Sequence, residues 1–159
     1  MVGTIVTGDP AGWRELLDLN LIGPAGNGRY AVPHFCADDR RDVVLIGSTG
    51  ATTPTACVGV YAASKRGLRG AFDSLRLELA EGGINVSLVM AGIFDAGGLV
   101  AAIAINGDVN EGAVPSFAAG VTAPPGPEPV ADAIAYMLGL PAAVCINELV
   151  IRPTAQLRP

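Results

Sequence analysis

Three short apolar runs along the chain have the length and composition of buried strands. They are Asp42–Gly47, Ile84–Met90 and Val144–Ile151. The first run is continuous rather than alternating, which is typical of a parallel strand whose two faces are both covered. Arg152 and Pro153 follow the third run and should end it, because proline has no N–H to donate to a sheet.

Apolar positions at three- and four-residue spacing predict helices between these runs. The clearest helix is expected over residues 60–81, followed by Gly82 and Gly83 as a stop signal. Its apolar face would carry Leu68, Phe72, Leu75 and Leu79. A shorter helix is expected over residues 129–138. Both would connect one strand to the next.

The first helical stretch is less regular. A helix is expected from Pro10 to about residue 38, and it should weaken beyond Asn20. The segment 23–28 holds one proline and three glycines, which lower helix propensity. The glycines of segment 23–28 also resemble those of a phosphate-binding loop. The stretch before the segment is predicted to be helical rather than a strand, so we interpret the segment as an irregular helix.

The alternation of strands and helices predicts the fold class. Strands separated by helices are expected to pair in parallel, which gives an α/β fold with a partial doubly wound parallel sheet. Residues 93–128 fit neither pattern; they are poor in charge and rich in alanine, glycine and proline, which makes them a candidate mobile lid. No repeat or linker divides the chain, so residues 1–159 are expected to belong to one domain.

Composition places the chain among globular proteins and argues against some functions. Half of the 159 residues are hydrophobic and 16% are charged, which argues against disorder. The net charge is −5 and no basic run occurs, so nucleic acid and anionic membranes are not expected as partners. No apolar run reaches about eighteen residues and no secretory signal is evident, which predicts a cytoplasmic protein.

Cysteine and histidine usage excludes further chemistries. Cys36, Cys57 and Cys145 are scattered and lack metal-type spacing, so reduced thiols are expected. His34 is the only histidine. A histidine-rich metal site or a Ser-His-Asp triad is therefore not expected, and we predict no metal site.

The candidate chemistry centres on a serine, a tyrosine and a lysine. Tyr61 and Lys65 would lie one turn apart on one face of a helix, and Ser48 precedes the tyrosine by thirteen residues. A nearby lysine ammonium stabilises a phenolate and so lowers the pKa of a tyrosine from its ordinary value of about 10. This suits proton transfer to or from a substrate oxygen that the serine holds. The three residues therefore suggest carbonyl–alcohol redox chemistry.

These residues also fall where a parallel sheet forms a crevice. Ser48 directly follows the first expected strand, Ala91 and Gly92 follow the second, and Tyr61 opens the helix between them. Ligands of such sheets bind beyond the carboxyl ends of the strands. Structural interpretations remain open: Tyr61 as a half-buried aromatic, Lys65 as a solvated side chain and Ser48 as a turn residue or cap.

Further motifs accompany the triplet in a fixed order. They are Asn20-Leu-Ile-Gly23, Gly83-Ile-Asn-Val86 and Met90-Ala-Gly92. Together with Ser48 and Tyr61-x-x-x-Lys65, they resemble the short-chain dehydrogenase/reductase family over about residues 9–156. The ending Ile146–Gln156 is similar to a subgroup related to NADP-dependent 3-hydroxy-acid and serine dehydrogenases.

The resemblance implies a Rossmann-like fold and an NAD(P)-dependent oxidoreductase that interconverts a carbonyl and an alcohol. Tyr61 would exchange a proton with the substrate oxygen, and Ser48 would hold that oxygen. Lys65 would lower the tyrosine pKa and bind the nicotinamide ribose. Asn20 would keep a kink in its helix and position a water that relays protons to Lys65.

The resemblance also implies a set of cofactor contacts. Tyr61, Lys65, Ala91, Gly92 and Phe94 would contact the nicotinamide end of the dinucleotide. The subgroup resemblance favours NADP slightly over NAD. The substrate would be a small carbonyl compound or alcohol.

The glycine-rich turn with which the family normally begins does not occur in this sequence. We therefore expect residues 1–159 to be the C-terminal, catalytic part of such a domain, truncated by roughly ninety residues at the N-terminus. Two alternatives follow: a catalytically silent fragment acting as a structural or oligomerisation module, or a binding domain for a small polar ligand. The helices over residues 10–38 and 60–81 could then join a second copy or a full-length relative. An exposed apolar strand edge over residues 42–47 should promote self-association.

Overall fold

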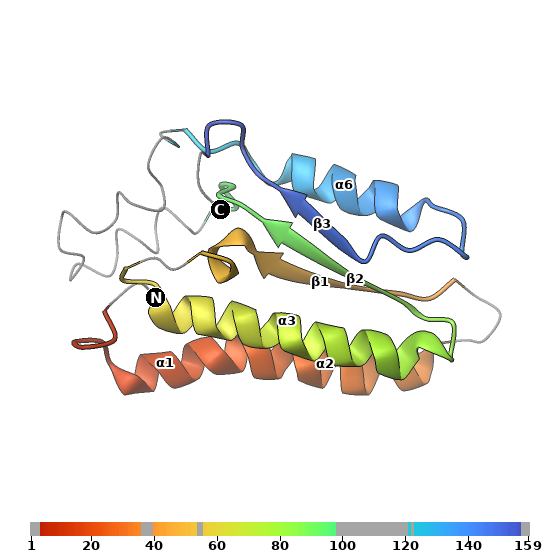
Figure 1. Ribbon diagram of the computed structural model, residues 1–159, viewed down its shortest axis with the longest axis horizontal. Coiled ribbons are helices and arrows are strands. Elements are labelled where there is room, and N and C mark those ends of the chain that lie inside the picture. The colour runs from red at the N-terminus through yellow and green to blue at the C-terminus, as the bar shows by residue number, and fades with distance from the viewer. Residues whose placement is uncertain (1–3, 36–39, 54–55, 98–120, 122, 157–159) are drawn as a thin grey trace.

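The computed structural model describes residues 4–35, 40–53, 56–97, 121 and 123–156. Three strands form a parallel sheet in the order β1-β2-β3 (Figure 1). They are β1 (Asp42–Ser48), β2 (Asn85–Ala91) and β3 (Glu148–Ile151). The predicted α/β fold with parallel strands is confirmed.

Helices connect the strands as the periodicity predicts. α3 (Gly59–Ala80) joins β1 to β2, and α6 (Glu128–Leu138) precedes β3. α3 runs along one side of the sheet with the first helical stretch beyond it, whereas α6 lies beside β3 on the other side (Figure 1). Gly83 follows α3 with a φ of 65°, a left-handed conformation that favours glycine and ends the helix.

The core lies between α3 and the sheet. Phe72 of α3 packs with Val86, Leu88 and Met90, which share one face of β2 because alternate strand residues point the same way. Leu68 of α3 is also buried. The core therefore fixes α3, and with it Tyr61 and Lys65, against the strand that follows it.

The first helical stretch is a continuous series of helical segments. It comprises α1 (Pro10–Leu17), a π-helical segment (Asp18–Ile22), α2 (Gly23–Ala31) and a 3₁₀ turn (Val32–His34). Asp9 caps α1 by accepting a hydrogen bond from the Ala11 amide at 3.0 Å. The helix irregularity falls at Asn20, inside the π-helical segment, and residues 23–28 are helical rather than a phosphate loop.

The third strand is shorter than predicted. The sequence predicts a strand over 144–151, but β3 begins at Glu148. The Val144 amide donates to Pro141 O at 2.8 Å in a turn, so that residue cannot take a regular place in a sheet ladder. Apolar composition alone does not distinguish a strand from an apolar turn beside one. That half of the prediction is wrong.

The first strand is also less buried than its sequence predicts. β1 pairs with β2 alone within the described residues, so it forms an edge of the sheet. Ile46 is 45% exposed. The prediction of a strand buried on both faces is therefore wrong for β1, although its composition resembles that of β2. Ser48 is the last residue of β1 rather than the first residue beyond it.

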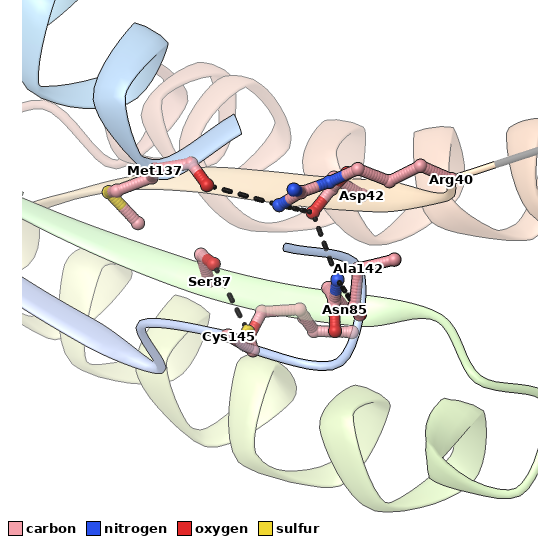
Figure 2. A network of polar contacts seen from close by, with 8 residues as sticks. Arg40, Asp42, Asn85, Ser87, Met137, Ala142 and Cys145 are labelled. Carbon is pink, nitrogen blue, oxygen red and sulfur yellow. Dashed lines mark hydrogen bonds and ion pairs between the residues drawn. The ribbon is translucent and has the colours of Figure 1, made fainter. Parts of the chain in front are cut away.

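A polar network fastens the end of the sheet at which β1 and β2 begin (Figure 2). Arg40 forms a salt bridge with Asp42 at 2.6 Å and also donates to the Met137 carbonyl, near the end of α6, at 3.0 Å. Asn85 donates to Asp42 at 3.3 Å and to the Ala142 carbonyl at 3.4 Å. The Asp42 carboxylate thereby connects the starts of β1 and β2, and Arg40 connects them to the end of α6.

Some sequence expectations lie outside the described residues. Cys36 and most of the candidate lid are among them. Cys57 and Cys145 are free thiols. Of the helices that the structure describes, none has both the length and the apolar character needed to cross a bilayer.

Candidate functional site

Ser48 and Tyr61 border the same point in the structure. Ser48 ends β1 and leads into a 3₁₀ turn (Thr49–Ala51), whereas Tyr61 lies in the first turn of α3. A Cβ placed on Gly50 would lie 3.3 Å from Ser48 Oγ and 3.6 Å from Tyr61 Cε1. Because Gly50 has no side chain, its backbone fits next to both Ser48 and Tyr61 without pushing either side chain away.

The hydrogen bonding of Ser48 leaves its proton available for a ligand. Ser48 Oγ accepts from the Gly50 amide at 3.1 Å. A hydroxyl can accept two hydrogen bonds and donate one, so this contact uses an acceptor position and fixes the rotamer. The site thus offers an oriented O–H donor beside a tyrosine.

Lys65 lies one turn after Tyr61, but its ammonium contacts the sheet. Lys65 Nζ donates to the Ile46 carbonyl oxygen at 3.1 Å. Burial lowers the pKa of Lys65 from its ordinary value, because removal of water disfavours the charged form. The structure therefore places the lysine near the site with its ammonium held by β1.

Asn20 connects to the tyrosine through another residue. Asn20 Nδ2 donates to Ser64 Oγ at 3.2 Å, and Ser64 Oγ donates to the Tyr61 carbonyl at 2.7 Å. Ser64 is fully buried. The π-helical segment is thereby tied to the first turn of α3. The structure supports a positioning contact for Asn20, whereas the predicted water relay to Lys65 stays a prediction.

Gly92 and Phe94 follow β2, whereas Ala91 is the last residue of that strand rather than the first residue beyond it. Ser48 and Ala91 are register partners, so the ends of β1 and β2 lie side by side. The Gly92 amide donates to the Ile151 carbonyl at 2.8 Å, and a Cβ on Gly92 would lie 3.2 Å from Arg152 Cα. A Cβ at position 92 would also overlap Gln156 Oε1, so a side chain there would require these neighbours to shift.

A cavity of about 460 Å³ lies beyond the end of β3, and neither Ser48 nor Tyr61 lines it. Phe94 lines it together with Pro125 from the segment before α6. Arg152 and Thr154, just after β3, line it as well. The cavity combines an aromatic wall with a guanidinium and a hydroxyl, groups that can bind a polar organic ligand.

Sequence reasoning did not assign a role to Gln156. Its carboxamide oxygen accepts from the Ile93 amide at 2.9 Å, and its nitrogen donates to Thr49 Oγ1 at 3.3 Å. Gln156 is 8% exposed and Thr49 is 4% exposed. It joins the segments after all three strands, next to Ser48 and Gly92. The only sequence signal for Gln156 is its place in the segment Ile146–Gln156, which carries the subgroup resemblance.

Comparisons with known proteins find relatives along most of the chain. The sequence model of a family described as short chain dehydrogenase matches residues 2–104. An uncharacterized oxidoreductase of Staphylococcus saprophyticus is 26% identical over 149 residues, which cover 94% of this chain and 57% of that protein. A (-)-trans-carveol dehydrogenase of Rhodococcus erythropolis is 37% identical over 76 residues, 47% of this chain and 27% of that enzyme.

Solved structures share the fold. A closed form of serine dehydrogenase complexed with NADP+ matches with a TM-score of 0.82 at 25% identity and covers 98% of this chain. A metagenomic short-chain oxidoreductase in complex with NADP matches with a TM-score of 0.69 at 28% identity over 96% of this chain. The match covers 61% of the first structure and 56% of the second. The chain thus matches these proteins along most of its own length. It spans little more than half of theirs.

Proposed function

The chain belongs to the short chain dehydrogenase family, and we propose that it carries the proton-transfer site of an NAD(P)-dependent oxidoreductase that interconverts a carbonyl compound and an alcohol. The observation that carries this proposal is the meeting of Ser48 and Tyr61 at Gly50. The Ser48 hydroxyl and the edge of the Tyr61 ring border the same glycine, which supports the proposal that both hydroxyls act on one substrate oxygen.

The proposed chemistry divides between the two side chains. In the direction of reduction, Tyr61 Oη gives a proton to the substrate oxygen while Ser48 donates a hydrogen bond to the same atom. In the direction of oxidation, the phenolate accepts the proton of the alcohol. A bound dinucleotide would supply or take up the hydride. The chain itself therefore orients the substrate oxygen and moves one proton.

The residues around the cavity fit the nicotinamide end of such a cofactor. Phe94 offers an aromatic surface at the cavity wall. Gly92 does not line the cavity but lies two residues before Phe94, where it approaches the Arg152 backbone. Arg152 and Thr154 add a cation and a hydroxyl at the cavity wall. The NADP complexes among the related structures support a nicotinamide dinucleotide as cofactor, and we propose NADP rather than NAD. We propose that Gly92, Phe94, Arg152 and Thr154 contact the cofactor.

The proposed domain organisation follows from the share of the relatives that is matched. The chain corresponds to 57% of the S. saprophyticus oxidoreductase. We propose that residues 1–159 act as the proton-transfer part of a larger dinucleotide-binding domain. Groups that hold the adenosine and phosphate end of the cofactor would come from outside the described residues.

A binding and turnover experiment tests this proposal. The purified chain is titrated with NADPH and NADH by calorimetry and assayed on a panel of ketones, aldehydes and alcohols. Tyr61→Phe should lower turnover about 10²- to 10⁴-fold, the usual contribution of a proton-transfer group, without changing cofactor affinity. Tyr136→Phe is the matched control, because Tyr136 is exposed on α6. Equal activity of both variants would contradict the role of Tyr61.

A structural or oligomerisation module is the second candidate. Several large apolar side chains on the first helical stretch are exposed; they are Leu19, Ile22 and Tyr30. Such surfaces can join a second copy or a longer relative. Absence of dinucleotide binding at millimolar concentration, together with a concentration-dependent molecular mass in sedimentation, would favour this candidate over catalysis by the chain alone.

A further inference from the structure

Gln156 brings its side chain back over the carboxyl end of the sheet. β3 ends at Ile151, and the turn after it is closed by the Gln156 amide, which donates to the Pro153 carbonyl at 2.9 Å. The residue is buried, although it lies beyond the last strand. Burial of a long amide side chain costs rotamer freedom and hydration, so it must be offset by specific contacts.

The carboxamide oxygen continues the hydrogen bonding of β2 where the sheet ends. The Gly92 amide still bonds to backbone, donating to the Ile151 carbonyl at 2.8 Å. The next amide, that of Ile93, donates instead to Gln156 Oε1 at 2.9 Å, and Ile93 is itself buried. A buried amide left unpaired is costly, so the side chain replaces a missing backbone acceptor. The start of the segment that leads to Phe94 is fixed in this way.

The carboxamide nitrogen reaches the other side of β2. It donates to Thr49 Oγ1 at 3.3 Å, and Thr49 directly follows Ser48 at the end of β1. Because the strand order is β1-β2-β3, a side chain from beyond β3 that bonds Thr49 must cross the end of β2. Gly92 lies at that crossing, where a Cβ would overlap Gln156 Oε1. The glycine thus leaves the space through which the carboxamide passes.

The bond to Thr49 fixes the turn that orients the Ser48 hydroxyl. Thr49 begins the 3₁₀ turn Thr49–Ala51, whose Gly50 amide donates to Ser48 Oγ at 3.1 Å. Thr49 is also buried, so its hydroxyl depends on a protein partner. Displacement of Thr49 would move the amide that holds the serine rotamer. Gln156 therefore acts on Ser48 through this turn.

We propose that Gln156 is a positioning residue that holds the Ser48 hydroxyl, which binds the substrate oxygen, at a fixed separation from the segment Ile93–Phe94, which lies beside the cofactor. The rate of transfer between cofactor and substrate depends on that separation, and a displacement of about 1 Å costs about 10²-fold in rate. A carboxamide suits this role because it offers an acceptor and a donor in one plane without a charge. The roles of Ser48 and Phe94 rest on the proposed function, whereas the contacts of Gln156 do not.

Substitutions at Thr49 and Gln156 test the role in turnover on the carbonyl panel. Thr49→Val keeps the volume but removes the acceptor, and Gln156→Ala removes both contacts. Each should lower kcat about 10- to 100-fold and change KM less than about threefold, because the reacting groups remain but are displaced. Thr49→Ser keeps the hydroxyl and should retain turnover. Ser87→Ala is the matched control, since it removes another buried hydroxyl with a side-chain partner, Cys145 at 3.5 Å, and should leave kcat unchanged.

A double substitution shows whether the effect passes through the serine. In a chain that already carries Ser48→Ala, Thr49→Val should lower kcat by less than about twofold further, because the hydroxyl that Thr49 positions is gone. A full additional loss in the double variant would mean that Thr49 acts independently of Ser48, which would contradict the proposal.

Amide exchange tests the positioning without turnover. The Gly50 amide reports the contact with Ser48, and the Ile93 amide reports the contact with Gln156. In Gln156→Ala both amides should exchange about 2- to 10-fold faster, the effect of one hydrogen bond. The Leu88 amide, in the middle of β2, should not change and so excludes a general loss of stability.

The side chain of Gln156 also gives a direct signal. Gln156 is the only glutamine of the chain, so its side-chain amide gives one pair of NMR signals in glutamine-labelled protein. Thr49→Val should shift this pair and speed its exchange, because the acceptor is gone. Thr49→Ser should keep the pair close to its wild-type position. The two variants thus measure the bond between Gln156 and position 49 by itself.

Two further results would overturn the proposal. One is unchanged exchange of the Gly50 amide in Gln156→Ala or, where that variant does not fold, in Thr49→Val. The other is full turnover of Thr49→Val in a chain whose Tyr61→Phe variant is impaired. A wild type without turnover would contradict the proposed function alone, because the exchange measurements need no cofactor and still decide whether Gln156 holds Ser48 in place.

Discussion

β1 and β2 are neighbouring strands of equal length that differ in how much of each is buried. Five consecutive residues of β2, Val86–Met90, are buried, and that strand is paired on both sides. In β1 only Gly47 is buried and Ile46 is 45% exposed. Apolar composition is similar in both. The difference shows that burial of a strand depends on its neighbours in the sheet, which its own residues do not reveal.

The comparison separates stability from function. β2 carries the core that positions α3, whereas β1 carries Ser48 and contacts Lys65. Because no described strand covers the outer side of β1, that strand keeps less packing than β2, which is paired on both sides. Each prediction below tests the difference in packing between β1 and β2 by a separate measurement.

The largest effect is expected from paired core substitutions. Leu88 and Leu45 are register partners, but Leu88 is fully buried and Leu45 only partly. Leu88→Ala should lower the free energy of unfolding by about 2–5 kcal/mol, and Leu45→Ala by about 1–2 kcal/mol, because less contact is lost. Urea titrations monitored by circular dichroism give both values. Equal losses would mean that the edge strand is packed as tightly as the central one.

Amide exchange should resolve the two sides of β1 itself. The backbone N–H and C=O groups of Val43 and Leu45 point toward β2. Those of Val44 and Ile46 point toward the side of β1 that no described strand covers. The outward amides should exchange at least about tenfold faster than the inward ones, since they lack a strand partner. Exchange measured by NMR at low protein concentration avoids protection by association. Uniform slow exchange along β1 would contradict an open edge.

The smallest effect concerns pH. Burial lowers the pKa of Lys65 in the folded chain, so the unfolded chain holds this proton more tightly. The cost of burying the ammonium is present at neutral pH and disappears as the pH rises through the lowered value toward 10.5. The stability of the wild type relative to Lys65→Met should therefore rise over that range. A constant difference would show that the lysine is not buried in solution.

Much of the fold could be predicted because it follows from local patterns. The periodicity of Leu68 and Phe72 gave α3 to within one residue at each end. The order of strands and helices gave the parallel sheet. The end of β3 was marked by Pro153, but its start was not, because Val144 is as apolar in a turn as in a strand.

The candidate site was predictable in composition and less so in contacts. The spacing of Ser48 and Tyr61 places both at the strand ends, and the structure brings them together. The partners of Asn20 and Lys65 were not predictable, since Ser64 lies 44 residues from Asn20 and Ile46 lies 19 residues before Lys65. Such contacts depend on how helices cross the sheet. Gln156 illustrates the same limit, as its partner Thr49 lies 107 residues away.

The single lysine makes the chain selectively addressable by amine chemistry. Apart from the α-amino group, reagents that acylate amines can react only at Lys65. Its lowered pKa leaves more of the neutral, nucleophilic amine at a given pH, while its contact with Ile46 restrains access. Coupling to a sensor surface through amines would therefore block the side chain that contacts β1 at Ile46. The rate of acylation, by contrast, would measure how much of the time the Lys65 side chain stays away from the strand.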